Sequence, residues 1–456
     1  MRRARVGLLA VAAAMTLIVA ACADDAEDLE AIEEEGREAF SGQEINLLLK
    51  EGYEIEAIQE FVGEFEDETG ISANIEVFDE PTTRQQFVLD ASTEGGAYDI
   101  VSLSFWNAPE FVRPGWLEPI TDEYLQATDE EWFDLDAISE GPLEALTMDG
   151  DIYAIPHTAI GGMFFYRESI FEEHGLEPPE TTDDVLALAE ELDELEPDMA
   201  PFVGRGAPTF ASLGSILGWA HGYGAQLFDE NDEPQATQPE MVEAIEDWVT
   251  LMREYGPADA AGLTFTEMGE TFQTSNAVMA FDTSGFGTIF EDPEQSEAAG
   301  DVGFAQVVGP AGEPLQWLYN EGLAIPSAAP NKEAAWLFIQ WRMSEDVTMR
   351  EVTDLHRLDV PHEGTLTSDE YAQFAEEEDL VDFTEALYES FDNVTDVHWP
   401  FYPQFAEIGD AVAATVSELI ADGGDVEAAL ADLQTELEEI MDEPVEDPEA
   451  EDPDDA

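Results

Sequence analysis

The chain has 456 residues, of which 44% are hydrophobic and 10% aromatic, so it is not a wholly disordered protein. Its length exceeds the ~250–300 residues at which single cores stop growing, which favours two lobes or domains. It carries 107 acidic residues against 14 basic ones, a formal net charge of −93. Without a basic stripe to neutralise phosphates, nucleic acid is not expected as a partner.

The acidity itself has two interpretations. A surface of this charge repels itself at ordinary ionic strength, and multimolar salt shortens the Debye length to about 3 Å or less. We therefore interpret the charge as the solvent adaptation of a halophile's protein. A specific use of negative charge is the alternative.

The N-terminus is typical of an export signal. Three arginines within the first five residues precede GLLAVAAAMTLIVA, an apolar run too short to span a membrane as a stable helix. The run ends in VAAC (19–22), which resembles a bacterial lipobox, and Cys22 is the only cysteine. We expect residues 1–21 to be a lipoprotein signal peptide, and a lipid on Cys22 to anchor the exported protein to the outer face of the cytoplasmic membrane. An ordinary secretory signal with an accidental cysteine is the alternative.

Strands and helices alternate after an acidic tether, residues 22–44. Residues 45–49 are predicted to form a buried strand, and the next apolar residues share one helical face that ends near Gly70. Residues 71–77 alternate as a second strand, and YDIVSL (98–103) is a third. This β-α-β order predicts a parallel sheet covered by helices.

The same alternation continues to the C-terminus. Further strands are expected at 163–166, 303–308 and 323–326, and further helices near 182–192, 241–253, 331–341 and 430–440. The acidic, proline-broken residues 442–456 are predicted to be disordered.

Motifs of catalysis or metal binding are missing from the sequence. The six histidines are scattered, no Cys/His cluster has metal-ligand spacing, and no Walker loop or G-x-S-x-G is found. Paired carboxylates would suit a glycosidase, but close pairs arise by chance in so acidic a chain. We expect a protein that is not an enzyme and has neither cofactor nor metal. A secreted carbohydrate-active enzyme remains the alternative from another class.

Several stretches share a pattern with one family. DGDIYAIPHTAIGGMFFYRESIFEEHGLEPPETTDDVLALAEEL (149–192) and NEGLAIPSAAPNKEAAWLFIQW (320–341) resemble extracellular solute-binding proteins of ABC sugar importers. Other stretches are similar to the polyol binders related to mannitol- and sorbitol-binding proteins: 79–90, 98–120, 202–208, 278–285 and 401–412. The resemblance covers nearly all of residues 45–441 in consistent order.

The resemblance implies an α/β, two-lobed periplasmic-binding-protein fold of type II, with a ligand cleft between the lobes at a hinge. Lobe one would hold 45–152 and 285–344, and lobe two 153–284 and 345–441. The protein would be a monomer that captures a sugar or polyol, closes, and presents the closed surface to an ABC permease. A non-transport sugar sensor of the same fold is a further alternative.

Aromatic rings and convergent polar groups are expected in such a cleft, because a sugar offers apolar C–H faces edged by hydroxyls. Phe105, Trp106 and Asn107 follow the strand 98–103, whose carboxyl end would meet the cleft. We predict that they contact the ligand. A loop whose aromatics cap the core is the alternative.

Five charged or titratable residues are further candidates for ligand contact. Arg205 and Asp282 match cleft residues of the family, and Glu80 matches a Glu-Asn-x-x-Arg pattern although a proline follows it here. Glu51 follows the first strand and His157 the first crossover. The alternatives are a structural salt bridge for Arg205, a hinge or capping role for Asp282, and a hinge position for His157.

The segment LQWLYNEGLAIP (315–326) supplies the last candidates. On a strand the side-chain period is two, so Trp317, Tyr319 and Glu321 would share one face. The related polyol binders tend to carry aromatics at three alternating positions here, and Glu321 takes the third. Glu321 is either another surface acid at the cleft mouth or a hydroxyl acceptor that replaces a stacking wall. We favour the acceptor.

Overall fold

The computed structural model describes residues 36–52, 55–129, 131–229, 231–378, 380–392, 402 and 404–442. The predicted signal peptide, Cys22, most of the tether and the tail beyond residue 442 lie outside these ranges. Among the described helices, none combines the length and the apolar character that crossing a membrane requires.

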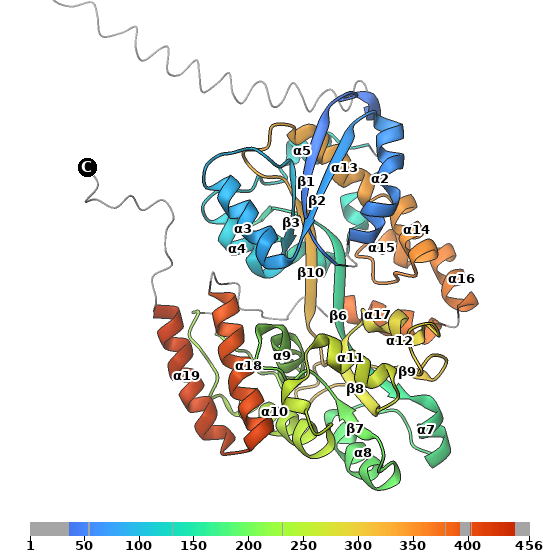
Figure 1. Ribbon diagram of the computed structural model, residues 1–456, viewed down its shortest axis with the longest axis vertical. Coiled ribbons are helices and arrows are strands. Elements are labelled where there is room, and N and C mark those ends of the chain that lie inside the picture. The colour runs from blue at the N-terminus through green and yellow to red at the C-terminus, as the bar shows by residue number, and fades with distance from the viewer. Residues whose placement is uncertain are drawn as a thin grey trace, which may run out of the picture.

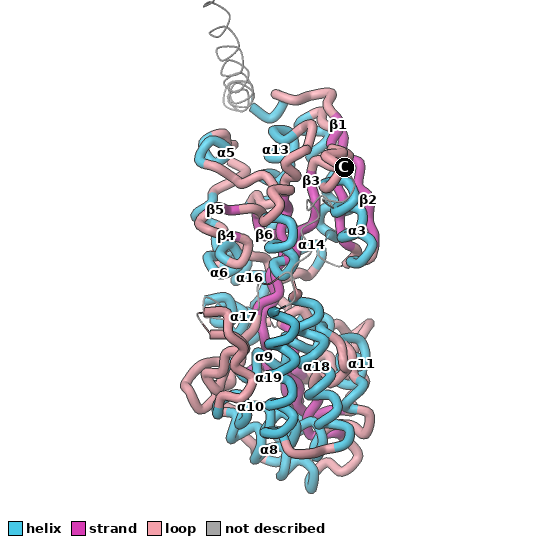
Figure 2. The backbone as a smooth tube through the Cα atoms, turned by 90° about the vertical axis from the view of Figure 1, so that its left-hand side faces the viewer, coloured by secondary structure: helices cyan, strands magenta, loops and turns pink. Residues whose placement is uncertain are grey.

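The molecule has two lobes, one above the other in Figure 1, joined by a narrow waist that is also visible in Figure 2. The upper lobe contains β1 (Glu44–Lys50), β2 (Ser72–Phe78), β3 (Ile100–Ser104) and β10 (Leu318–Ala324). β1 pairs in parallel with β2 and β3, which confirms the predicted β-α-β start, and β10 pairs antiparallel with β3. The carboxyl ends of the parallel strands therefore point towards the waist.

Strand β6 (Ile155–Arg167) runs from the upper lobe into the lower one. Its first half pairs antiparallel with β10, and its second half pairs antiparallel with β8 (Ala277–Thr283) and β9 (Val302–Ala305). β7 (Ala200–Val203) extends the lower sheet in parallel with β8. All thirteen residues of β6 are buried. The β6–β10 pair is thus a covalent and hydrogen-bonded connection between the lobes.

Helices flank both parts of the sheet. Those of the upper lobe are α2 (Glu56–Thr69), α3 (Glu80–Ala91), α4 (Ala108–Val112), α5 (Asp122–Gln126), α6 (Glu140–Glu144), α13 (Lys332–Arg342), α14 (Glu345–Leu355), α15 (Glu363–Leu366) and α16 (Asp369–Glu377), with the small hairpin β4 (Thr147–Met148) and β5 (Asp151–Ile152). Those of the lower lobe are α7 (Glu168–His174), α8 (Thr182–Leu195), α9 (Leu213–His221), α10 (Pro239–Thr250), α11 (Phe265–Gln273), α12 (Phe286–Glu291), α17 (Val381–Asp392), α18 (Phe405–Asp422) and α19 (Val426–Asp442). Short helical turns are η1 (Gly36–Glu38), η3 (Phe105–Asn107), η4 (Leu135–Ala137), η5 (Phe210–Ser212), η6 (Leu251–Tyr255) and η7 (Ala260–Gly262).

The ends of these helices follow from local sequence. α2 buries Ile58, Phe61 and Phe65 on one face, and ends where Gly70 adopts φ 73°, a left-handed conformation that suits glycine. α8 begins at a capping box in which Thr181 and Asp184 satisfy each other's backbone N–H groups. The apolar spacing and the terminal residues together explain why both helices were predictable.

Packing favours lobe bounds that differ from those the sequence predicts. The segment 285–344 was expected in lobe one, but β9 within it pairs with β6, and Phe290 of α12 packs on Phe165 and Phe272 of the lower lobe. α14 was expected in lobe two, but it packs on α2 and α13. We propose that α12 and β9 belong to lobe two and α14 to lobe one.

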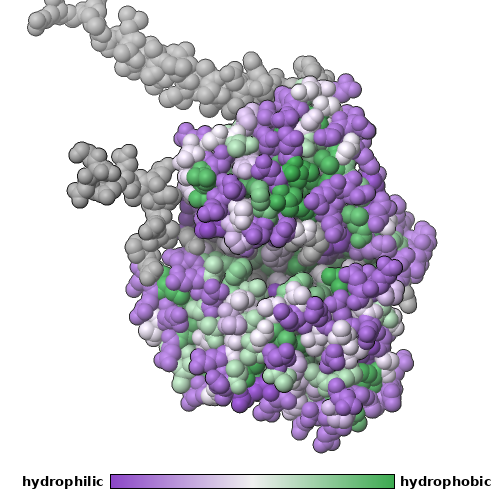
Figure 3. All heavy atoms as spheres, viewed as in Figure 1, coloured by the Kyte–Doolittle hydropathy of each residue, from purple (hydrophilic) through white to green (hydrophobic). Residues whose placement is uncertain are grey.

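The surface reflects the composition. Hydrophilic residues cover most of the face drawn in Figure 3, and apolar residues form patches on both lobes, the most prominent on the upper one.

One buried histidine makes stability sensitive to acid. The Nδ1 atom of His362 accepts a hydrogen bond from Thr365 N at 3.0 Å, which caps α15. Burial lowers the pKa of His362 from 6.5 to about 4, so the unfolded chain binds the extra proton between these values. Stability from this group is fully present above about pH 6.5 and is lost as the pH falls towards 4.

We predict that the free energy of unfolding falls by up to about 3 kcal/mol across that window because of His362 alone. The variant His362→Asn keeps an acceptor for Thr365 but does not titrate, so its stability should fall less steeply with acid. Urea unfolding between pH 7 and 4.5 at fixed multimolar KCl measures both proteins. Equal slopes for the two would contradict the assignment.

Candidate functional site

A cavity of about 240 Å³ lies between the lobes, and seven of its eleven lining residues are aromatic. The upper lobe contributes η3, which follows the carboxyl end of β3, and β10 with the residues before it. The lower lobe contributes the first residues of η5, α11 and α18. The lining consists of Phe105, Trp106, Ile160, Arg205, Phe210, Ala211, Gly214, Phe265, Trp317, Tyr319 and Phe405.

The indole ring of Trp317 packs against three glycines. A Cβ atom on Gly162, Gly214 or Gly218 would lie 2.8, 2.9 or 2.6 Å from the indole of Trp317, closer than side chains tolerate. The absence of side chains at these positions of β6 and α9 lets the ring lie flat against backbone. Trp317 is 3% exposed, so it forms a fixed wall of the cavity.

Trp106 spans the two lobes. Its ring stacks on Phe405 at a centroid distance of 5.5 Å and an interplanar angle of 20°, and it lies 5.8 Å from the ring of Phe210. Phe105 meets Phe405 and Tyr319 edge-on at 6.4 and 6.1 Å. These contacts close the cavity with rings from both sides of the waist.

Arg205 and Asp282 form a buried bidentate pair at the cavity. Arg205 Nε donates to Asp282 Oδ2 at 2.8 Å, its Nη2 donates to Oδ1, and its Nη1 donates to the carbonyl of Ala211 at 2.7 Å. The guanidinium carbon lies 5.0 and 5.4 Å from the ring centroids of Phe265 and Trp317. Asp282 is 0% exposed, because Arg205 covers it. Arg205 thus forms the structural salt bridge that the sequence left open as the alternative to ligand contact. It also lines the cavity, where a ligand could meet it.

Glu321 lies beneath the cavity and does not line it. It is fully buried, and its Oε2 atom is 2.6 Å from Lys50 Nζ and accepts hydrogen bonds from Tyr319 OH at 3.0 Å and Ser104 Oγ at 3.2 Å. Burial alone would raise the pKa of Glu321, but the charges of Lys50 and His157 and the hydrogen bonds from Lys50 and Tyr319 lower it. The carboxylate is therefore ionised and occupied by protein groups.

The remaining candidates fall at different depths. Asn107 and Glu80 line a small polar recess next to Lys50, where burial raises the pKa of Glu80. His157 is 1% exposed and faces Glu321 at 3.8 Å, and Glu51 is exposed outside the cavity. The structure thus brings together Phe105, Trp106, Arg205, Trp317 and Tyr319 as cavity walls, with Asp282, Glu321 and His157 behind them. For these last three, direct ligand contact gives way to a supporting position, because other side chains cover them.

Among the residues that sequence reasoning missed are three aromatic rings of the cavity, and Lys50 beside it. Phe405 lies within the segment 401–412 that resembled the polyol binders, and Phe210 lies two residues beyond another such segment. Phe265 follows Thr264, which forms a capping box with Glu267, so a helix start was readable there. Lys50, one of two lysines, ends the first predicted strand. None of these signals indicates which rings meet across the waist.

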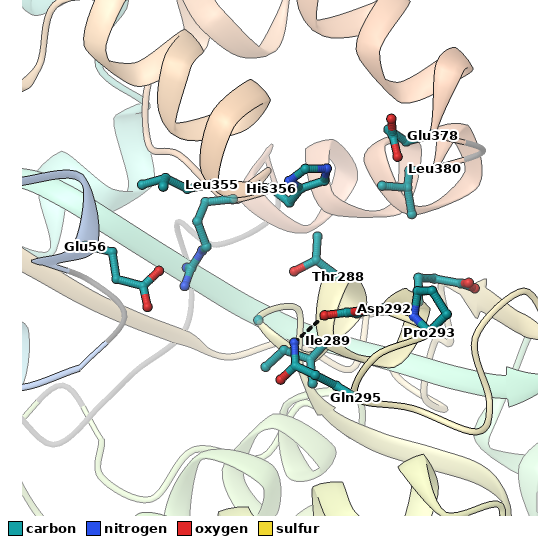
Figure 4. A pocket seen from close by; sticks show the side chains of 13 residues that line it. Glu56, Thr288, Ile289, Asp292, Pro293, Gln295, Leu355, His356, Glu378 and Leu380 are labelled. Atoms are coloured by element: carbon teal, nitrogen blue, oxygen red, sulfur yellow. Dashed lines mark hydrogen bonds between the residues drawn. The ribbon is translucent and has the colours of Figure 1, made fainter. Parts of the chain in front are cut away.

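A larger cavity, about 490 Å³, is lined by residues of α12 and by residues that follow α14 and α16. Figure 4 shows carboxylates, His356 and short apolar side chains around it, with Asp292 accepting a hydrogen bond from Gln295 at 2.5 Å. Its described lining contains no aromatic residue that a sugar could stack on except the imidazole of His356. No cluster of described residues could hold a metal ion. The aromatic cavity is therefore the better candidate site.

Comparison with known proteins agrees with this geometry. A profile of bacterial extracellular solute-binding proteins matches residues 51–349. A mannitol-binding protein of Pseudomonas aeruginosa is 29% identical over 275 residues, which is 59% of this chain and 61% of the relative. An erythritol/L-threitol-binding protein of Mycolicibacterium smegmatis is 24% identical over 67% of this chain and 68% of its own length.

A solved structure is similar over almost its whole length. The solute-binding protein of an ABC transporter from Agrobacterium vitis S4, with bound D-mannitol, is 26% identical, with a TM-score of 0.74. The match covers 88% of this chain and 98% of that one. The likeness supports the two-lobed architecture.

The Arg205–Asp282 pair yields a stability prediction. Because both groups are buried, Asp282→Ala leaves an uncompensated charge and should lower the free energy of unfolding by about 3–5 kcal/mol. The matched control is Glu110→Ala, which removes a bidentate partner from the half-exposed Arg84 and should cost about 1 kcal/mol or less. Urea unfolding in multimolar KCl measures the free energy of unfolding of both variants. Equal losses would show that the buried Arg205–Asp282 pair matters no more to stability than an exposed pair.

Proposed function

The chain belongs to the bacterial extracellular solute-binding proteins, and from this premise we propose that it captures a small sugar or polyol and delivers it to an ABC importer. The observation that carries the proposal is the aromatic cavity at the waist, with walls from both lobes. Its volume of about 240 Å³ suits a ligand of monosaccharide size. The mannitol-binding and erythritol/L-threitol-binding relatives support the same class of ligand.

Capture would use three kinds of interaction. The apolar C–H faces of the ligand stack on Trp106, which Phe405 holds in place, and on Trp317. Trp317 is held by its packing against the three glycines. Hydroxyls at the ligand's edge meet the guanidinium of Arg205, which lines the cavity. Closure of the lobes about β6 and β10 removes the ligand from water, so affinity and closure are one thermodynamic quantity.

The cellular setting is part of the proposal. The family is extracellular, and the lipobox-like residues before Cys22 support anchoring of the exported protein by a lipid. The composition supports a halophilic source, in whose salt the surface charges are screened. A monomer docked on the permease subunits in the membrane completes the proposed arrangement.

Hydrolysis of a glycoside is supported less well. A glycosidase needs two carboxylates that flank the scissile bond, at separations of about 5–10 Å. The cavity lining that the structure describes includes no carboxylate side chain, and Asp282 behind it is engaged by Arg205. Binding without chemistry is the function that this lining suits.

A ligand panel tests the proposal. In multimolar KCl we expect D-mannitol, ribitol or erythritol to raise the melting temperature, because a ligand at 100 times its Kd adds about 2.7 kcal/mol of stability. Isothermal titration then gives Kd for the ligands that shift it. The absence of any shift across polyols, monosaccharides and disaccharides would overturn the proposal.

Trp106 is expected to dominate the stacking. Trp106→Ala should weaken binding of the best ligand about ten- to a hundredfold, since burying an aromatic or aliphatic side chain is worth about 1.5–3 kcal/mol. Trp116→Ala is the matched control, because Trp116 is half-buried against Phe111 and does not line the cavity. An equal loss of affinity in both variants would argue against direct stacking on Trp106.

A further inference from the structure

Glu321 is a buried carboxylate that the capture mechanism does not use directly. It lies in the middle of β10, two residues beyond the cavity wall residue Tyr319, and none of its surface is exposed. Its Oε2 atom collects Lys50, Tyr319 and Ser104, whereas its Oε1 atom has no hydrogen-bond donor among the described residues. A ligand could reach this carboxylate only by displacing protein groups.

A β-bulge in β6 lies opposite the buried carboxylate of Glu321. The register between β10 and β6 shifts between Glu321 and Gly322, whose partners are Thr158 and Pro156, so β6 has one extra residue there. That residue is His157, and its Nε2 atom lies 3.8 Å from Glu321 Oε1. Gly322 is required, because a Cβ atom would lie 2.5 Å from Leu146 Cδ1 and 2.8 Å from Ala154 Cβ. Such bulges re-aim side chains, and this one brings His157 against the acid.

Stability alone does not account for this arrangement. A buried ion pair is often no more stable than apolar side chains of the same volume, since two charges must leave water. The incompletely bonded Oε1 atom adds a further penalty. A buried charge pair at this place is therefore better explained by what it orients.

The group it orients is Tyr319. The phenol hydroxyl donates to Glu321 Oε2 and accepts from Lys50 Nζ, which also lies 4.8 Å from the centroid of the Tyr319 ring. Lys50 ends β1, so the pair ties the first strand of lobe one to the hinge strand β10. Tyr319 is thereby held from its hydroxyl end while its ring lines the cavity.

We propose that Glu321, with Lys50, is a positioning residue that fixes the Tyr319 ring as a wall of the cavity. The proposal rests on the capture of a polyol or sugar proposed above. The related polyol binders tend to carry a third aromatic ring at this position of the strand. Here Glu321 takes the position and supports the second ring, that of Tyr319. The cavity then recognises its ligand by a rigid Tyr319 face, and the acid never touches the ligand.

The first test needs no ligand. In protein labelled with 3-fluorotyrosine, the ¹⁹F resonance of Tyr319 is the one that disappears in Tyr319→Phe. The charge-balanced variant Lys50→Met/Glu321→Met should shift and broaden this resonance, because the hydroxyl loses both partners. Lys332→Met/Glu118→Met is the matched control: it removes another part-buried Lys–Glu pair without changing the net charge, and it should leave the Tyr319 resonance unmoved. A Tyr319 resonance unchanged in Lys50→Met/Glu321→Met would overturn the proposal.

The second test measures affinity for D-mannitol by titration. Tyr319→Phe and Lys50→Met/Glu321→Met should each bind about tenfold more weakly, and the combined variant should bind within about twofold of either, since both changes release the same ring. Multiplied losses, or wild-type affinity in Lys50→Met/Glu321→Met, would show that Glu321 is structural only. If that variant does not fold, the single variant Glu321→Gln, which keeps an acceptor, should show wild-type affinity, and a tenfold loss there would contradict the role. If the wild-type protein binds no polyol, the proposed function fails and the ¹⁹F result still decides the positioning role.

Discussion

The antiparallel pairing of β6 with β10 is the constraint on which the rest of the structure depends. β6 alone carries the sheet from the upper lobe to the lower one, and β10 pairs with it on the upper side. Three lining residues of the cavity lie on this pair or next to it: Tyr319 is in β10, Trp317 directly precedes β10, and Ile160 is part of β6. A movement of one lobe against the other must bend these two strands, so it also moves the part of the cavity wall that Trp317, Tyr319 and Ile160 form.

Basic residues are scarce in this chain, and three of them form ion pairs with buried acids. Of 14 lysines and arginines in the chain, Arg205, Lys50 and Arg342 each pair with a buried acid at or near the waist. Arg342 also donates to the backbone carbonyl of His157, the bulge residue. The ion pairs of the interior thus follow the hinge strands from the cavity side to α14. In a chain where acids cover the surface, each of these three cations pairs with a buried acid inside one lobe: Lys50 and Arg342 in the upper lobe, and Arg205 in the lower one.

Much of the fold was predictable because its signals are local. The periodicity of β1 and α2, the glycine that ends α2 and the capping box of α8 each lie within one element. The face shared by Trp317, Tyr319 and Glu321 also followed from the period of a strand. The burial of Glu321 was not predictable, because Lys50 from β1 and Ser104 from β3, which cover it, are far away in sequence. The rings of Phe210 and Phe405 were missed for the same reason: nothing local indicates that they meet Trp106 across the waist.

The electrostatics of the cavity fit the extreme charge of the chain. The two ionised pairs at the site, Arg205 with Asp282 and Lys50 with Glu321, are each balanced internally, so neither leaves a net charge facing the ligand. A ligand held by charge would lose affinity in multimolar salt, where exposed charges are screened within a few ångströms. Stacking on apolar rings is strengthened or unaffected by many salts, because it depends on water leaving apolar surface. An aromatic cavity for a neutral, hydroxyl-bearing ligand is therefore a form of recognition that would work at the high ionic strength that we propose for this chain of net charge −93.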